Sequence, residues 1–82
     1  MQKDLATKAR LLDEEGYFYN FDRELYVNRR IRKAFSIDFI EEHDEAEIEE
    51  RIRRATDKRK WQFYFNSGPS EAVKRELERV LG

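Results

Sequence analysis

Apolar and polar residues alternate along much of the stretch from Gly16 to Ile40, which holds seven of the chain's eleven aromatic residues. A period of two is typical of β-strands, because successive side chains point to opposite faces of a sheet. Polar connections divide the stretch into three strands, which we expect to pair in order as an antiparallel meander. The predicted strands are Tyr17–Phe21, Leu25–Asn28 and Lys33–Ile40.

A helix beginning at Ser36 is the alternative to the end of the third strand. Its apolar stripe would continue from Ile40 to His43 and Asp44, neither of which is apolar. An amphipathic helix keeps its apolar residues on one face, so the interruption favours the strand.

Two segments with helical spacing flank this meander. The first helix is predicted at Asp4–Glu15 and ends before Gly16, because glycine accepts the left-handed conformation in which many helices end. The second is predicted at Asp44–Thr56, where Asp44 and Glu47 have the spacing of a capping box.

A fourth strand and a third helix complete the predicted elements. The strand is Trp61–Asn66, which again alternates, and the helix begins at Pro69 with Gly68 as its cap. The fourth strand has two possible neighbours, the third strand, with a parallel orientation, or the first. We therefore expect a single α+β domain over residues 1–82, with an N-terminal helix, a three-stranded antiparallel meander, a helix, a fourth strand and a C-terminal helix, and with all helices packed on one face of the sheet.

The alternation assigns the strand residues to two faces. The predicted core face carries Tyr17, Tyr19, Phe21, Leu25, Val27, Phe35, Ile37, Phe39, Trp61, Phe63 and Phe65. The opposite face mixes aromatic rings with amides, and it carries Phe18, Asn20, Tyr26, Asn28, Ser36, Asp38, Ile40, Gln62, Tyr64 and Asn66. We interpret this second face either as an ordinary solvated surface or as a binding platform for a peptide or for nucleic-acid bases.

Composition limits the class of protein. Charged residues make up 43% of the chain, yet the net charge is only −1, which indicates a well-solvated folded surface. No apolar run reaches the roughly 18–20 residues of a membrane span, and the N-terminus does not resemble a signal peptide. The chain has no cysteine. We therefore expect a small soluble, cytoplasmic domain that does not contact a membrane.

Catalytic chemistry has little support in the sequence. His43 is the only histidine, it lies among carboxylates before a predicted helix, and a metal site needs several converging ligands. No nucleophile motif is present, so we expect no enzyme activity, no cofactor and no metal.

Positive charge concentrates at Arg29–Lys33, in a predicted hairpin tip, and at Arg53–Lys60, which covers the end of the second helix and the loop after it. Our first hypothesis is a small non-catalytic protein-interaction module that binds an unknown protein partner or a second copy of itself. The alternative is a nucleic-acid-binding domain that uses both basic clusters with Tyr26 and Tyr64. The candidate binding residues are Tyr26, Asn28, Arg29, Arg30, Arg32, Lys33, Gln62 and Tyr64.

Overall fold

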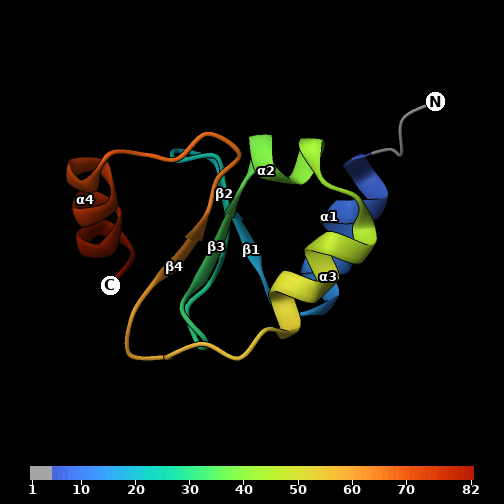
Figure 1. Ribbon diagram of the computed structural model, residues 1–82, viewed down its shortest axis with the longest axis horizontal. Helices are drawn as coiled ribbons and strands as arrows, with labels where there is room; N and C mark the ends of the chain where they lie inside the picture. Colours follow the sequence, from blue (N-terminus) through green and yellow to red (C-terminus); the bar gives the residue numbers. More distant parts are fainter. Residues whose placement is uncertain (1–4) are drawn as a thin grey trace.

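A computed structural model describes residues 5–82 and confirms the α+β class with an N-terminal helix and a meander of strands (Figure 1). Asp4, the predicted start of the first helix, lies outside the described residues. Each predicted helix and strand has a counterpart, and one additional short helix follows the third strand. In chain order the elements are α1 (Leu5–Glu14), β1 (Phe18–Asn20), β2 (Leu25–Asn28), β3 (Lys33–Ser36), α2 (Ile37–Glu42), α3 (Glu45–Arg53), β4 (Gln62–Tyr64) and α4 (Glu71–Leu81).

The four strands form one mixed sheet in the order β1-β2-β3-β4. The first three strands pair antiparallel, as the meander predicts, and β4 pairs parallel to β3. Of the two places that the sequence allowed for the fourth strand, the chain uses the one beside the third. A parallel neighbour requires a crossover connection, which here is made by α2, α3 and the segment that follows them.

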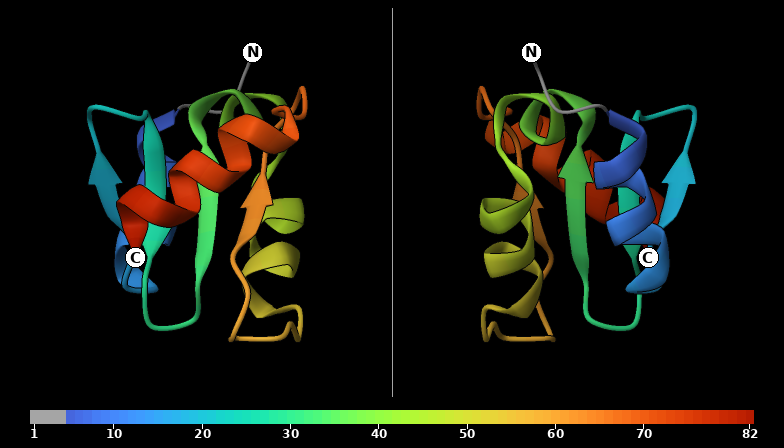
Figure 2. Two further views of the ribbon diagram at one scale, coloured as in Figure 1. Left: turned by 90° about the vertical axis from the view of Figure 1, so that its left-hand side faces the viewer. Right: turned by 90° about the vertical axis from the view of Figure 1, so that its right-hand side faces the viewer.

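The helices cover both faces of the sheet, so the expectation that all of them pack on one face was wrong. Figures 1 and 2 show α1, α2 and α3 on one side of the strands and α4 alone on the other. The physical reason is that β3 is buried on both faces, with Phe35 in one hydrophobic cluster and Ala34 in the other. A strand buried on both sides needs a layer of structure on each of them.

Two hydrophobic clusters correspond to these two interfaces. The buried residues between the sheet and the α1–α3 layer are Leu12, Tyr17, Phe35, Phe39, Ile40, Ile48 and Ile52. Those between the sheet and α4 are Leu25, Val27, Ala34, Trp61, Leu77 and Leu81.

The predicted division of the strands into two faces was also wrong, because of the register. Tyr26 pairs with Phe35 and Val27 with Ala34, so Phe35 lies on the same face as Tyr26. Both hairpin loops contain four residues, and an even-numbered loop pairs an odd position on one strand with an even position on the next. The prediction instead placed odd positions of all strands on one face. A shift of one residue exchanges every side chain between faces.

The two hairpin loops are built alike. An asparagine precedes each, and its side-chain oxygen accepts a backbone N–H within the loop: Asn20 from Arg23 at 3.0 Å, and Asn28 from Arg30 at 3.0 Å. The last loop residues, Glu24 and Arg32, have φ values of 55° and 58°, in the left-handed region that favours glycine. These asparagine contacts are the local turn chemistry that polar loop residues provide.

The third predicted strand ends at Ser36 because a helix begins there, so the rejected helical alternative was correct from Ile37 onward. The Ser36 hydroxyl accepts the backbone N–H of Phe39 at 3.2 Å, which is the N-cap interaction of a helix. The helix then ends at Glu42. The helix was rejected because His43 and Asp44 would interrupt its apolar stripe. That argument does not apply to a helix of six residues, which ends before His43.

The caps of the remaining helices follow the predicted chemistry at one of two positions. Asp44 caps α3, accepting the N–H of Glu47 at 2.9 Å, as its spacing predicts. In α4 the cap is Ser70, which accepts the N–H of Val73 at 3.2 Å, and not Gly68 as predicted. Serine replaces glycine in this role because its hydroxyl supplies the acceptor that glycine lacks.

Candidate interaction surfaces

The aromatic–amide face that the sequence proposed as a platform is not an open sheet face. Tyr64 is half-buried and its ring stacks on Phe35, with centroids 4.7 Å apart. Tyr26 is also half-buried, packs against the same core cluster and lies 4.9 Å from the ring of Tyr19. Burial raises the pKa of both phenols, Tyr26 and Tyr64.

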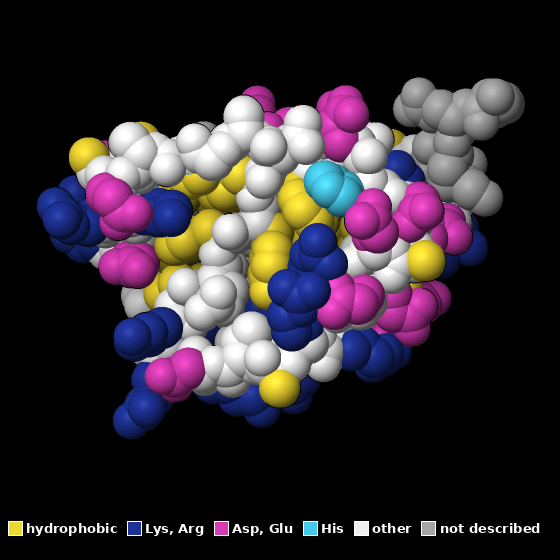
Figure 3. Space-filling view, in the orientation of Figure 1, with side chains coloured by type: hydrophobic (Ala, Val, Ile, Leu, Met, Phe, Trp, Pro, Cys, Tyr) yellow, Lys and Arg dark blue, Asp and Glu magenta, His cyan; other side chains and the backbone are white. Residues whose placement is uncertain are grey.

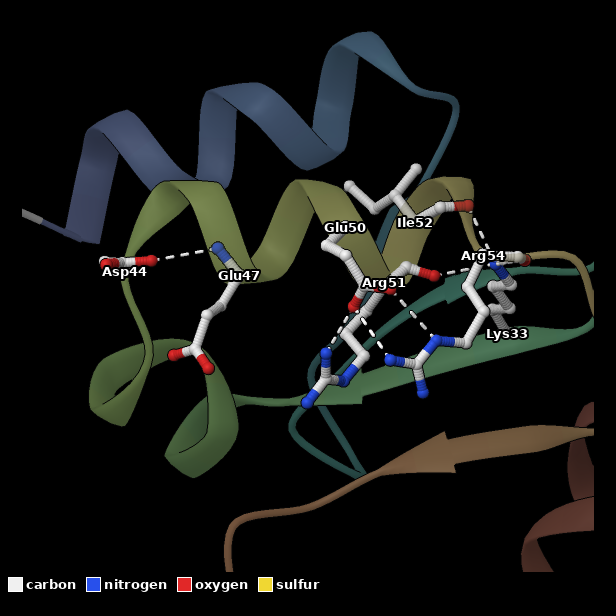
Figure 4. Close-up of polar contacts among 7 residues, drawn as sticks. All are labelled: Lys33, Asp44, Glu47, Glu50, Arg51, Ile52 and Arg54. Carbon is white, nitrogen blue, oxygen red and sulfur yellow. Dashed lines mark hydrogen bonds and ion pairs between the residues drawn. The ribbon is translucent and has the colours of Figure 1, made fainter.

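Lys33 has its ammonium group inside the protein. Its side chain comes from β3 and ends at the last turn of α3, as Figure 4 shows. The Nζ donates to the carbonyl oxygens of Arg51 and Ile52 at 2.7 Å and of Arg54 at 2.8 Å. Desolvation lowers the pKa of Lys33, with the nearby positive charge of Arg54 adding to the effect. These contacts satisfy carbonyls that a helix leaves unpaired at its C-terminus.

Asn28 and Arg29 also bond within the protein. Asn28 is buried, and its Nδ2 donates to the carbonyl oxygen of Glu15 at 3.2 Å. The Nε of Arg29 donates to the carbonyl oxygen of Leu81 at 2.8 Å, which ties the β2–β3 loop to the end of α4. Their role in binding a partner stays a prediction, and these contacts give both residues a structural role.

The structure brings the two basic clusters together at one end of the sheet. The backbone N–H of Gln62 donates to the carbonyl oxygen of Arg32 at 2.9 Å, which joins the α3–β4 segment to the β2–β3 loop. Figure 3 shows Lys and Arg side chains along the lower margin of the molecule, where these two segments lie in Figure 1. Among the described residues, four side chains of this region have no ion pair or hydrogen bond, and we call them the basic end: Arg30, Arg32, Lys58 and Lys60.

Several other cations of the predicted clusters are paired with carboxylates. Arg53 contacts Glu15 at 2.9 Å and Glu49 at 3.3 Å, and Arg54 contacts Glu50 at 3.0 Å. Two of these contacts are the i, i+4 pairs that stabilise a helix. Arg59 pairs with Asp57 at 3.1 Å. The positive charge open to a ligand is therefore smaller than the count of basic residues indicates.

A second surface lies along the edge strand β1, and the sequence pattern placed only its Phe18 on the possible binding face. Phe18 is 76% exposed and Phe21 is 83% exposed, the largest values among the exposed large hydrophobic residues. Val73 and Val80 of α4 are 46% and 45% exposed. We call Phe18 and Phe21 the β1 surface. The sequence contains a sign of this exposure. Phe18 is at an even position and Phe21 at an odd one, so in an extended strand they point to opposite faces of the sheet. Both rings are buried only if both faces are covered.

The β1 surface exists because the helix layers do not extend over β1. Figure 2 shows α1 over β2 on one side of the sheet, and α4 ending beside β1 on the other. The ring of Phe21 contacts that of Tyr19 at 4.7 Å, while Phe18 lines a hollow with Val27 and Arg29 on the opposite face. Each face of this edge therefore presents one exposed phenylalanine.

His43 closes α2 and does not form part of a metal-ligand cluster. Its Nδ1 lies 2.9 Å from the carbonyl oxygen of Phe39, and its ring stacks on the Phe39 ring at 3.9 Å. Within residues 5–82 no group of three or more potential metal-ligating side chains converges.

Neither a membrane span nor a similarity to a known protein helps to interpret these surfaces. In the part of the chain that the structure describes, no helix combines the length and apolarity needed to cross a membrane. Comparisons with protein-family models, with curated proteins and with solved structures found no match to this chain.

Proposed function

We propose that this chain is a non-catalytic, cytoplasmic protein-interaction module that binds its partner through the β1 surface. The observation that carries the proposal is the exposure of Phe18 and Phe21 on an edge strand. Two phenylalanines left three-quarters or more in water forgo a hydrophobic gain of about 1.5–3 kcal/mol each. Large apolar side chains exposed at an unpaired strand edge are typical of a site where another protein binds.

Photo-crosslinking in the cells that produce the protein tests the proposal. A benzophenone amino acid replaces Phe21, and a matched variant carries it at Glu47, an exposed residue of α3. We expect a discrete protein adduct on irradiation of the Phe21 variant and none with the Glu47 variant. The absence of any protein adduct at position 21, with both variants folded, contradicts a protein-interaction role for this surface.

A second candidate function is nucleic-acid binding, and the observation that favours it is the convergence of the two basic segments. The β2–β3 loop and the α3–β4 segment meet at the bond between Gln62 and Arg32. The four unpaired cations of the basic end, two from each segment, support this candidate, because phosphate contacts need free positive charge. The half-buried rings of Tyr26 and Tyr64 contribute less than a free stacking platform would.

Fluorescence anisotropy with labelled single-stranded RNA and DNA separates this candidate from the first. We expect binding at low salt to weaken with salt, and the salt dependence to fall in an Arg30→Glu, Lys58→Glu variant, since each lost phosphate contact lowers the slope by about one. Arg10→Glu, an exposed position on α1, is the matched control. Affinity that is independent of salt, or equal in both variants, rejects the nucleic-acid role.

A further inference from the structure

Two further exposed apolar residues lie on one flank of α4. Val73, Glu76 and Val80 are spaced at i, i+3 and i+7, so they share a side of this helix. Glu76 pairs with Arg23 of the β1–β2 loop at 3.4 Å, which shows that this side faces the β1 half of the sheet. Phe18 itself lines a hollow together with the buried Val27.

The backbone edge of β1 is three residues long and carries no lysine, proline or bulge that would discourage another strand from pairing with it. Natural edge strands carry lysine, proline or a bulge, each of which opposes addition of a strand. The residues of β1 are Phe18, Tyr19 and Asn20, and their pairing with β2 is continuous. The opposite edge strand, β4, is preceded by the charged run Lys58–Lys60. Of the two edges, β1 is thus the one open to strand addition.

Charge at the two ends of β1 is opposite in sign. Arg29 and Arg30 line the hollow beside Phe18, at the beginning of the strand. Asp22 and Glu24 lie in the loop at its end, and among the described residues neither carboxylate has an ion pair. An antiparallel neighbour of the same sequence would bring the basic beginning of each β1 against the acidic end of the other.

We propose that the partner of the β1 surface is a second copy of this chain, bound by antiparallel pairing of β1 with β1 about a two-fold axis. The two sheets become one sheet of eight strands, since each copy contributes four. An isologous contact requires a self-complementary surface, and the edge strand, the exposed phenylalanines and the opposed charges all meet this requirement. The inference rests on the proposed function and names the partner.

Sedimentation of the full chain from micromolar to millimolar concentration tests the pairing. We expect the wild type to reach twice the monomer mass, and a Phe18→Ser, Phe21→Ser variant to remain monomeric with an unchanged circular dichroism spectrum. Leu5→Ser is the matched control, because Leu5 is an exposed large hydrophobic residue outside the β1 surface, at 38% exposure on α1, and its variant should dimerise normally.

A charge exchange tests the antiparallel direction independently. An Asp22→Lys, Glu24→Lys variant and an Arg30→Glu variant should each associate about tenfold or more weakly than the wild type, because like charges then oppose across the axis. Mixed together, the two variants should form a heterodimer, since every altered charge meets its opposite. Arg29 is left unchanged because it holds the end of α4.

The outcomes separate this inference from the proposed function. A wild type that stays monomeric up to millimolar concentration, with an adduct to a different protein at position 21, overturns self-pairing and leaves the interaction role standing. A monomer with no adduct of any kind overturns both. A dimer that survives in the Phe18→Ser, Phe21→Ser variant assigns dimerisation to another surface and overturns the inference.

Discussion

The Nζ of Lys33, at the start of β3, lies 2.7 Å from the carbonyl oxygen of Ile52 in the last turn of α3. Lys8 of α1 makes an equivalent contact with α2, donating to the carbonyl oxygen of Ile40 at 3.0 Å. Both lysines are buried, at 2% and 4% exposure. Each therefore connects a helix C-terminus to another element, and the positive charge lies where the helix dipole favours it.

Replacing Lys33 with methionine should destabilise the protein by about 2–4 kcal/mol, because three carbonyl oxygens, one buried and two partly buried, lose their donor. Lys58→Met is the matched control at an exposed position, and should change the free energy of unfolding by less than about 0.5 kcal/mol. Urea unfolding of both variants measures the difference. Equal stability of the two variants would show that water replaces the Lys33 ammonium without cost.

Asp38 should make stability depend on pH in the acid range. Although burial opposes ionisation, hydrogen bonds from the Ser36 hydroxyl and the N–H groups of Asn66, Ser67 and Phe39 lower the pKa of Asp38 below its ordinary value of 3.8. The unfolded chain then takes up a proton before the folded one as pH falls. The stabilisation is therefore complete above the ordinary pKa, and it is lost as pH falls through the lower folded pKa.

Asp38→Asn tests this link between α2 and the segment after β4. We expect the variant to be about 1–2 kcal/mol less stable than the wild type near neutral pH, with the difference shrinking below about pH 4. Asp22→Asn, a loop carboxylate without an ion pair among the described residues, should show no such convergence. A constant difference between wild type and Asp38→Asn down to strongly acid pH contradicts the assignment.

The two aromatic environments of the sheet should respond differently to truncation. Phe35 is fully buried between Tyr17, Phe39 and Tyr64, so Phe35→Ala should cost about 3–5 kcal/mol. Phe35→Leu, with a smaller loss of volume, keeps the test measurable if the alanine variant does not fold. Phe21→Ala should change monomer stability by less than about 0.5 kcal/mol, as thermal unfolding at low concentration will show.

Glu24 offers a stabilising substitution. Its φ of 55° costs a residue with a Cβ about 1–2 kcal/mol, and glycine relieves this cost at an entropic penalty of about 0.5–1 kcal/mol. Glu24→Gly should therefore raise the free energy of unfolding by about 0.5 kcal/mol. Asp22→Gly in the same loop, where φ is not positive, should lower it, so a shared direction of change in the two variants contradicts the explanation.

The sequence predicts the element order because periodicity and local capping chemistry are properties of neighbouring residues. Asp44 illustrates this, since its cap is formed by a residue three positions away. The assignment of strand residues to the two faces failed because it depends on whether each hairpin loop has an odd or an even number of residues. The local sequence does not show where a strand ends and its polar loop begins. The helix at Ile37 was missed because its single turn and a half is too short for a periodic signal.

The candidate site was predicted in part for the same reason. Arg32 lies beside the α3–β4 segment because of the tertiary fold. The sequence shows both basic segments but does not show that they come together. The burial of Lys33 and Asn28 depends on partners 13 to 21 positions away, so composition made them resemble exposed binding residues. Phe18 was assigned to the possible binding face and Phe21 to the core face. Their exposure could not be predicted, because it is decided by how far the covering helices extend.

The placement of α4 alone on its side of the sheet has a consequence during translation. About 17 positions separate Tyr64 from Leu81, so at roughly 5–20 residues per second the ribosome completes α4 about one to three seconds after β4. Until α4 has emerged, the nascent chain carries Leu25, Val27 and Trp61 on an uncovered apolar surface. We therefore expect a chaperone to bind the chain most strongly during this interval, because the apolar surface is then exposed.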